Sequence, residues 1–290
     1  MIEGILINGL IRGGVYALLA VGFALIFGVA RMINLAHTCF YMLAAYGIYT
    51  FASLLGWHPI ASIILSLVIT TLIGLGTYKL FINRIREHQV TVLLITLALA
   101  MVFQECMVLA FGGHYLGAPS FVSGYLKIIG VKVSYQHLLT FGTVIVVLLG
   151  IWALLSKTRL GIAIRATAQD AEIANLMGID VSRILLVTMG IAAALAAVSG
   201  VVVAPTLVLE PHMWTHPLVM IMAIVVLGGL GSVKGSFIGA FIIGFVEVLV
   251  VFLVPAGAFL KGAIALLVMV IVLLVRPEGL FGIAFEEERL

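Results

Sequence analysis

The sequence has little charge and little cysteine for its length. Charged residues make up 9% of the 290 positions, far below the roughly 25% of an ordinary soluble domain. That shortage excludes a water-soluble globular fold. The net charge of +3 is small and scattered, which argues against a nucleic-acid partner. Cys39 and Cys106 both lie in apolar segments without a Cys-x-x-Cys spacing, so we expect free thiols rather than a disulfide or metal site.

Enzyme motifs are also missing. The sequence contains no His-Glu-x-x-His and no Gly-x-Ser-x-Gly. The glycine-rich run 228–235 resembles a phosphate loop only superficially, because Lys234 is followed by Gly235 and Ser236 instead of standing in a Gly-Lys-Ser/Thr ending. We therefore predict that the chain is not an enzyme and binds no cofactor itself, so that any ATP is handled by another chain.

A pair of histidines has the spacing of metal ligands on a helix. His212 and His216 are four residues apart, with Glu210 nearby. Pro211 and Pro217 make a helix there doubtful, so we predict no metal site.

What the sequence has in abundance is apolar residues, which make up 64% of it and give a mean hydropathy of +1.32. Apolar runs long enough to cross about 30 Å of hydrocarbon recur along most of the chain, and they lack the alternation of β-barrel strands. We predict an all-α, polytopic transmembrane bundle formed as a single domain over residues 1–290. The first run lacks a basic flank and a cleavage site, so we expect a first span rather than a signal peptide.

The apolar runs predict eight or nine spans. The segment before residue 231 is short and could be re-entrant, which leaves the count open. The expected spans cover about residues 5–28, 34–55, 60–81, 90–111, 137–155, 184–204, 218–230, 236–254 and 258–275.

Basic residues predict the orientation, because loops rich in Lys and Arg stay in the cytoplasm. They gather in the loop 79–86, in the segment 157–183 and at Arg276. Alternating spans can put all three on one side. The loops 112–136 and 205–217 and the N-terminus are then external, and the C-terminus is cytoplasmic.

The segment 157–183 concentrates charge in an otherwise apolar chain. Asp170 is suited to cap the N-terminus of a helix, and Glu172 would lie at the positive end of its dipole. Gly178 stands where a left-handed C-terminal cap falls. We predict a capped helix of about two turns over 170–178, which is marginal by itself and requires a docking partner.

Among the charged residues within predicted spans, three stand out. Glu105 and Glu247 either take part in a pathway or form structural hydrogen bonds between helices. Arg12 either extends toward the headgroups or faces a substrate.

Two interrupted apolar segments resemble each other. In 28–47 and in 228–244, an apolar run and a glycine precede a polar break with a histidine or lysine, and a glycine-containing apolar run follows. Either the similarity is due to chance or the chain contains an internal repeat. Interrupted segments at matching places indicate a translocation site.

Four motifs in order carry a resemblance to a known family. They lie at 16–46, where Asn34-Leu-Ala-His37 stands, at 161–179, at 227–239 and at 276–282. Over nearly its whole length the chain resembles the membrane permeases of the branched-chain amino acid ABC importers, the LivH/LivM type. The resemblance implies a subunit in a bacterial or archaeal plasma membrane that moves a small amino acid such as Leu, Ile or Val into the cytoplasm.

The resemblance also implies partners and site residues. A second homologous permease subunit, two cytoplasmic ATPase subunits that hold ATP and Mg, and a periplasmic or extracellular binding protein are expected. The cytoplasmic loop would couple to an ATPase, and the two polar breaks would line the substrate pathway. The coupling candidates are Arg165, Asp170, Glu172, Ala174, Asn175 and Gly178, and the pathway candidates are Asn34, His37, Tyr41, Ser232 and Ser236.

One departure concerns the substrate. The family usually has a glycine and an acidic residue after the histidine of its first motif, and this chain has Thr38 and Cys39. The alternatives are a permease for urea, amides or other amino acids, and an ion-coupled secondary transporter whose intramembrane glutamates relay protons.

Overall fold

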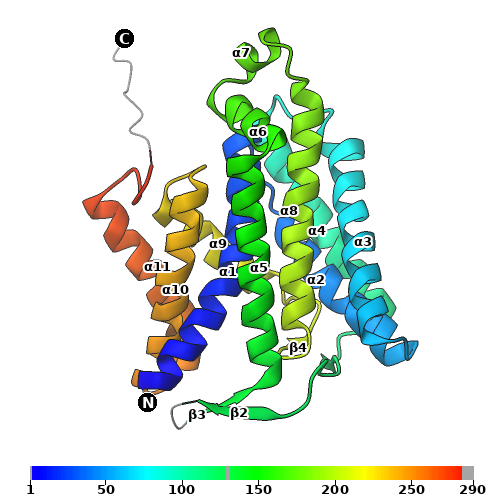
Figure 1. Cartoon of the computed structure of the whole chain (residues 1–290), viewed down its shortest axis with the longest axis vertical. Helices are drawn as coiled ribbons and strands as arrows, with labels where there is room; N and C mark the ends of the chain where they lie inside the picture. The colour runs from blue at the N-terminus through cyan, green and yellow to red at the C-terminus, as the bar shows by residue number, and fades with distance from the viewer. Residues whose placement is uncertain (1, 129–130, 283–290) are drawn as a thin grey trace.

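The computed structural model describes residues 2–128 and 131–282, and its helices form a bundle with a common long axis (Figure 1). Among the described residues, seven helices are long and apolar enough to cross a membrane. This finding confirms the predicted polytopic helical bundle. The seven are α1 (Ile2–Ala30), α3 (Pro59–Thr77, continued by the π-helix η2, Tyr78–Ile82), α4 (Gln89–Phe111), α5 (Tyr135–Lys157), α8 (Val181–Val203), α10 (Val233–Leu253) and α11 (Gly257–Val275).

Two further apolar helices are shorter and begin inside the bundle. The helix α2 (His37–Ile48) continues as the π-helix η1 (Tyr49–Leu54), and α9 spans Thr215–Gly228. The imidazole Nε2 of His37 lies 3.1 Å from the carbonyl oxygen of Leu19, well inside α1. The predicted eight or nine spans thus consist of seven long helices and two partial ones.

The helices fall into two halves that run in opposite directions. In each half a long helix, α1 or α8, is followed by a segment that returns into the bundle, 31–36 or 204–214. A partial helix and two long helices complete each half. The helix α1 packs against α10, and α8 packs against α3 in the equivalent way. This arrangement is an inverted repeat of the kind found in transporters.

The structural repeat pairs different segments from those that resemble each other in the sequence. The break at 31–36 has its structural counterpart at 204–214, whereas 229–232 forms the tight turn between α9 and α10. The predicted match between 28–47 and 228–244 is therefore wrong as an alignment. In an inverted repeat, equivalent segments occupy equivalent places in the bundle, but their polar residues do not have to follow in the same order. Similarity in the order of polar residues therefore paired segments that are not equivalent.

Small residues set the closest helix contacts, as is usual between helices in a bilayer. A methyl group added at Gly244 in α10 would lie 2.5 Å from the Cα of Gly13 in α1, so only hydrogen fits there. Ser66 of α3 donates a hydrogen bond of 2.7 Å to the carbonyl of Ala44. The outward side of α3 is apolar and exposed, for example at Ile64, which suits a face toward lipid.

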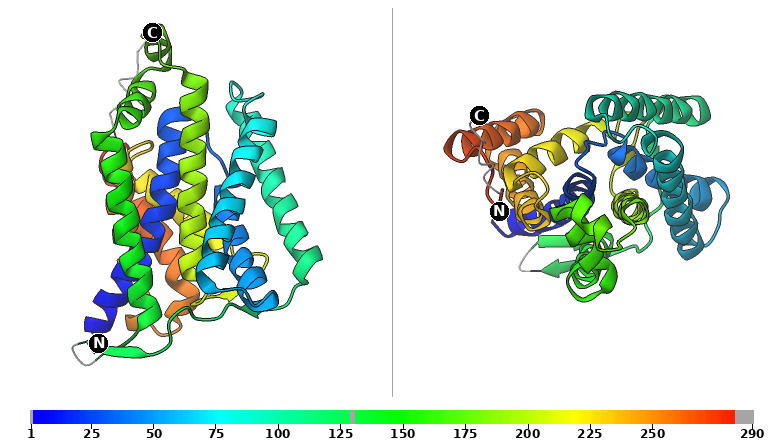
Figure 2. Two further views of the ribbon diagram at one scale, coloured as in Figure 1. Left: turned by 45° about the vertical axis from the view of Figure 1, so that its right-hand side comes forward. Right: turned by 90° about the horizontal axis from the view of Figure 1, so that it is seen from above.

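Figure 2 shows the two halves from further directions. The helices α3 and α4 lie on one flank, α10 and α11 lie on the other, and α1 and α8 lie between them. The core formed by α1, α2, α8 and α9 is the most buried part of the chain.

The two ends of the bundle differ. One end, here called the α7 end, carries α6 (Arg159–Gln169) and α7 (Ala171–Leu176). The other, here called the strand end, carries the N-terminus and two small antiparallel pairs, β1 (Leu116–Gly117) with β4 (Val208–Leu209) and β2 (Tyr125–Ile128) with β3 (Val131–Ser134). Basic residues concentrate at the α7 end: Arg31, Lys79, Arg84, Arg86, Lys157, Arg159, Arg165, Arg183, Lys234 and Arg276.

The segment 205–217 is only partly a loop. Its first residues pair with β1 at the strand end through β4. From Pro211 onward it enters the bundle, where Met213 and Trp214 are buried, and α9 begins at Thr215. The proline at position 217 falls in the first turn of α9, where its missing N–H is tolerated.

Candidate functional site

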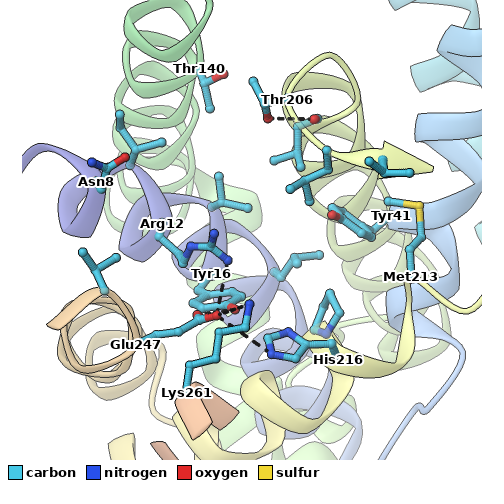
Figure 3. Close-up of a pocket in the computed structure, with 18 of the residues that line it drawn as sticks. Asn8, Arg12, Tyr16, Tyr41, Thr140, Thr206, Met213, His216, Glu247 and Lys261 are labelled. Atoms are coloured by element: carbon cyan, nitrogen blue, oxygen red, sulfur yellow. Dashed lines mark hydrogen bonds and ion pairs between the residues drawn. The ribbon is translucent and has the colours of Figure 1, made fainter. Parts of the chain in front are cut away.

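A cavity of about 700 Å³ lies in the half of the bundle nearer the strand end (Figure 3). Its volume falls within the range of about 300–1,000 Å³ typical of small-ligand sites. The walls are mainly apolar and come from α1, α10 and the segment 203–217. The apolar lining residues include Ile11, Val15, Leu19, Met213, Val248 and Val251.

Four charged or polar side chains meet at the carboxylate of Glu247 in α10, here called the Glu247 cluster. The hydroxyl of Tyr16 donates to Oε2 of Glu247 over 2.6 Å. On Oε1, the Nζ of Lys261 in α11 lies at 3.0 Å and the Nη1 of Arg12 in α1 at 3.3 Å. The Nε2 of His216, in the first turn of α9, lies 3.9 Å from Oε1. Figure 3 shows the five side chains converging from four helices.

The cluster lies at membrane depth. Arg12 stands ten residues into α1, about 15 Å from its start at 1.5 Å per residue. An isolated charge at this depth is costly, which is why such charges pair or face a polar cavity. Glu247 is 1% exposed and fully enclosed by its partners, while the side chains of Arg12 and Lys261 are 40% and 27% exposed. All three residues line the cavity, and the two cations are far more exposed than the carboxylate.

Sequence reasoning identified only part of the Glu247 cluster. It singled out Glu247 and left Arg12 open between the headgroups and a substrate. The hydrogen bond to Glu247 shows that Arg12 turns inward, so the expectation that it extends to the headgroups is wrong. Lys261, His216 and Tyr16 were missed. The sequence did contain a signal for this cluster. Arg12 and Lys261 are isolated cations in apolar helices, and such cations are expected to pair with a buried carboxylate.

The other intramembrane carboxylate is placed differently. Glu105 is exposed on the surface of α4, six residues before that helix ends at Phe111. Its Oε1 accepts a hydrogen bond of 3.3 Å from Gln104. Glu105 thus lies about midway between the centre of α4 and its end at Phe111, on the outside of the bundle.

The five predicted pathway residues separate in the structure. Tyr41 lines the cavity. Asn34 is buried and accepts a bond from the amide of Ala36, and buried His37 contacts α1. Ser232 caps α10 by accepting from the amide of Gly235, and buried Ser236 follows in the first turn. The last four lie outside the residues that line this cavity, and their part in a pathway stays a prediction.

The short helix predicted over 170–178 is present as α7 with both of its caps. Oδ1 of Asp170 accepts from the amide of Ile173 over 2.9 Å. Gly178 has φ of +84°, a left-handed conformation that favours glycine. The amide of Gly178 bonds the carbonyl of Asn175 and that of Ile179 bonds Ala174, each at 3.0 Å. This pair of bonds is a Schellman motif.

The helix α7 turns apolar side chains away from the bundle. Ala174 is buried, whereas Leu176 and Met177 are 85% and 79% exposed. Glu172 and Asn175 are exposed beside them, and Arg165 is exposed on α6. An exposed apolar group rimmed by polar residues is typical of an interaction site.

Comparisons with known proteins agree over almost the whole chain. A family model described as the permease component of the branched-chain amino acid transport system matches residues 5–273. The high-affinity branched-chain amino acid transport system permease protein BraD of Pseudomonas aeruginosa is 30% identical, with 96% of this chain and 94% of that protein covered. The corresponding permease protein LivH of Escherichia coli is 28% identical, with 95% and 94% covered.

A solved structure has the same fold. PsaBC from Streptococcus pneumoniae in complex with Fab matches with a TM-score of 0.55 at 16% identity, covering 94% of this chain and 92% of that one. At that identity the likeness concerns the arrangement of the helices alone.

Proposed function

The chain belongs to the family of permease components of branched-chain amino acid transport systems, and from this premise we propose that it is the membrane-spanning subunit of an ABC importer for Leu, Ile or Val. The observation that carries the proposal is the family match, which extends over residues 5–273 and covers every membrane helix apart from the first three residues of α1 and the last two of α11. The subunit lies in the inner membrane as a multi-pass protein.

The cavity supports a branched-chain amino acid as the substrate. Its apolar walls suit an aliphatic side chain, and the Glu247 cluster supplies polar partners for charged ends. Urea or a small amide would leave the apolar wall without a partner. Glu247 contacts two cations, which favours a fixed counter-ion over the proton relay that an ion-coupled transporter requires.

The energy for transport comes from partner subunits in this proposal. Two cytoplasmic ATPase subunits bind ATP and Mg, and α7 inserts its exposed Leu176 and Met177 into a groove on one of them. The two caps keep α7 rigid, so that movement of the ATPase is passed to α6 and the bundle. The permease chain itself carries out no catalysis.

The proposed orientation places the α7 end in the cytoplasm, because the basic residues gather there. The strand end then faces outward, where a binding protein delivers the amino acid to the cavity. A second homologous permease subunit completes the membrane part of the importer.

Reconstitution with the ATPase and binding-protein partners tests this function. In proteoliposomes, labelled leucine should enter only with ATP and all partners present. Glu172→Arg, which reverses a charge on α7, and Gly178→Pro, which the left-handed φ forbids, should reduce both ATPase association and uptake at least tenfold. Lys127→Glu, a charge reversal at the strand end, is the matched control and should assemble normally. ATP-independent leucine uptake by the permease alone, driven by an ion gradient, would refute the proposal.

A further inference from the structure

The charges of the Glu247 cluster do not cancel. Arg12 and Lys261 each bring one positive charge, and both contact the same oxygen of a single carboxylate. The cavity lining has another carboxylate, Glu210, but among the described residues it forms no ion pair with these cations. The cluster therefore has one positive charge in excess, with His216 counted as neutral.

The excess charge is directed at the cavity. Both carboxylate oxygens of Glu247 are occupied, one by Tyr16 and the other by the two cations. The guanidinium of Arg12 has five N–H donors, and it uses Nη1 for Glu247. Both cationic side chains are partly exposed and line the cavity. Donors of Arg12 and Lys261 therefore remain free for a further oxygen ligand, and a guanidinium suits a carboxylate because it can bind both oxygens.

The start of α9 adds to the same positive field. Thr215, His216 and Pro217, in its first turn, line the cavity next to the Glu247 cluster. The N-terminus of a helix favours a negative group, and transporters use such interrupted helices for the carboxylate of a substrate. Nε2 of His216 is buried and has no hydrogen-bond partner among the described residues, which leaves one more polar atom for a ligand.

We propose that Arg12 and Lys261 form a subsite for the carboxylate group of the transported amino acid. Glu247, held by Tyr16, is the fixed counter-ion that keeps the two cations at this depth when the cavity is empty. The side chain of the ligand then packs against the apolar wall formed by Ile11, Val15 and Val248. This subsite rests on the proposed function, and it specifies which end of the amino acid the permease recognises.

A comparison of two ligands tests the subsite. L-leucine and L-leucinamide have the same side chain and amino group, but only leucine has a carboxylate. The full chain, purified with its ATPase partners in lipid nanodiscs, is titrated with each by isothermal calorimetry. The wild type should prefer leucine at least about tenfold, and Lys261→Met should remove most of that preference by weakening leucine alone. Lys79→Met, the same change at an exposed lysine of the α7 end, should keep the wild-type preference.

Two further variants separate charge from folding. Lys261→Arg keeps the charge and should keep the preference for leucine. The double variant Lys261→Met with Glu247→Gln removes one charge of each sign, so the excess positive charge stays on Arg12 and the preference should partly return. If the ion pair were only structural, the preference for leucine over leucinamide would not depend on the excess positive charge of the cluster.

The outcomes are distinct. If Lys261→Met and the wild type prefer leucine equally, or if an assembled double variant shows no preference, the carboxylate subsite is wrong. If either of these binding results is found while the wild-type complex in proteoliposomes still takes up leucine, the proposed function stands and only the subsite is wrong. If the wild-type complex takes up no amino acid, the proposed function falls.

Discussion

At the scale of single residues, burial separates two glutamates that the sequence treats alike. Glu105 and Glu247 both stand in long apolar helices, and nothing local distinguishes them. The structure places Glu105 on the outer surface of α4 and Glu247 among two cations and a tyrosine. The difference arises from tertiary packing, since the partners of Glu247 come from α1 and α11, at the two ends of the chain.

The two glutamates should respond differently to the same substitution. Glu247→Gln leaves Arg12 and Lys261 without their counter-ion, and breaking a buried ion pair costs about 3–5 kcal/mol. Partial exposure of both cations reduces that cost, so we expect a loss of about 2 kcal/mol, seen as a lower midpoint of thermal unfolding in detergent. Glu105→Gln is the matched control and should leave the midpoint unchanged. Equal midpoints for the two variants would contradict the description of the Glu247 cluster.

At the scale of elements, the sequence predicted the bounds of the helices well, but not the depth at which the two partial helices begin. Apolar runs placed the seven long spans within a few residues of their observed bounds. The caps of α7 were predictable because Asp170 and Gly178 act on neighbouring backbone groups. The first residue of α9 was predicted within three positions, but its depth in the bundle was not predictable, because that depth depends on the packing of α1 and α10 around it.

Close packing of α1 on α10 provides a test at this scale. Gly244→Val puts a branched side chain where a single methyl group would already touch Gly13, so the two helices must separate. Because Arg12 directly precedes Gly13 on α1 and Glu247 lies three residues after Gly244 on α10, we expect loss of the folded protein in size-exclusion chromatography or a strong fall in leucine uptake.

The control for this substitution is Gly142→Val on α5. Nothing lies within 4 Å of a methyl group added at Gly142, so the same change of volume should be tolerated in a helix of similar length. Wild-type elution and uptake for Gly244→Val would show that α1 and α10 do not pack as described.

At the scale of the whole molecule, the inverted repeat explains where the cavity lies. Each half contributes a partial helix that starts inside the bundle, and the first turn of α9 reaches the Glu247 cluster. The class of fold followed from the apolar runs in the sequence, and the family followed from its short motifs. The cavity did not, because its lining combines α1, α5, α10 and the segment before α9, which no local pattern connects.

The central claim is that this cavity is the passage for an amino acid entering from the strand end. In a chain whose two native cysteines are replaced by alanine, Thr206→Cys introduces a thiol at an exposed position of the cavity lining. Ser123→Cys introduces one at the same end, at an exposed position outside the cavity lining. A charged, membrane-impermeant thiol reagent is added outside cells, and leucine uptake is measured.

We expect both cysteines to react. Uptake should fall by at least about 90% for Thr206→Cys and stay unchanged for Ser123→Cys, and leucine should slow the reaction at residue 206 alone. Full modification at residue 206 with unchanged leucine uptake would contradict the assignment of the cavity as the passage.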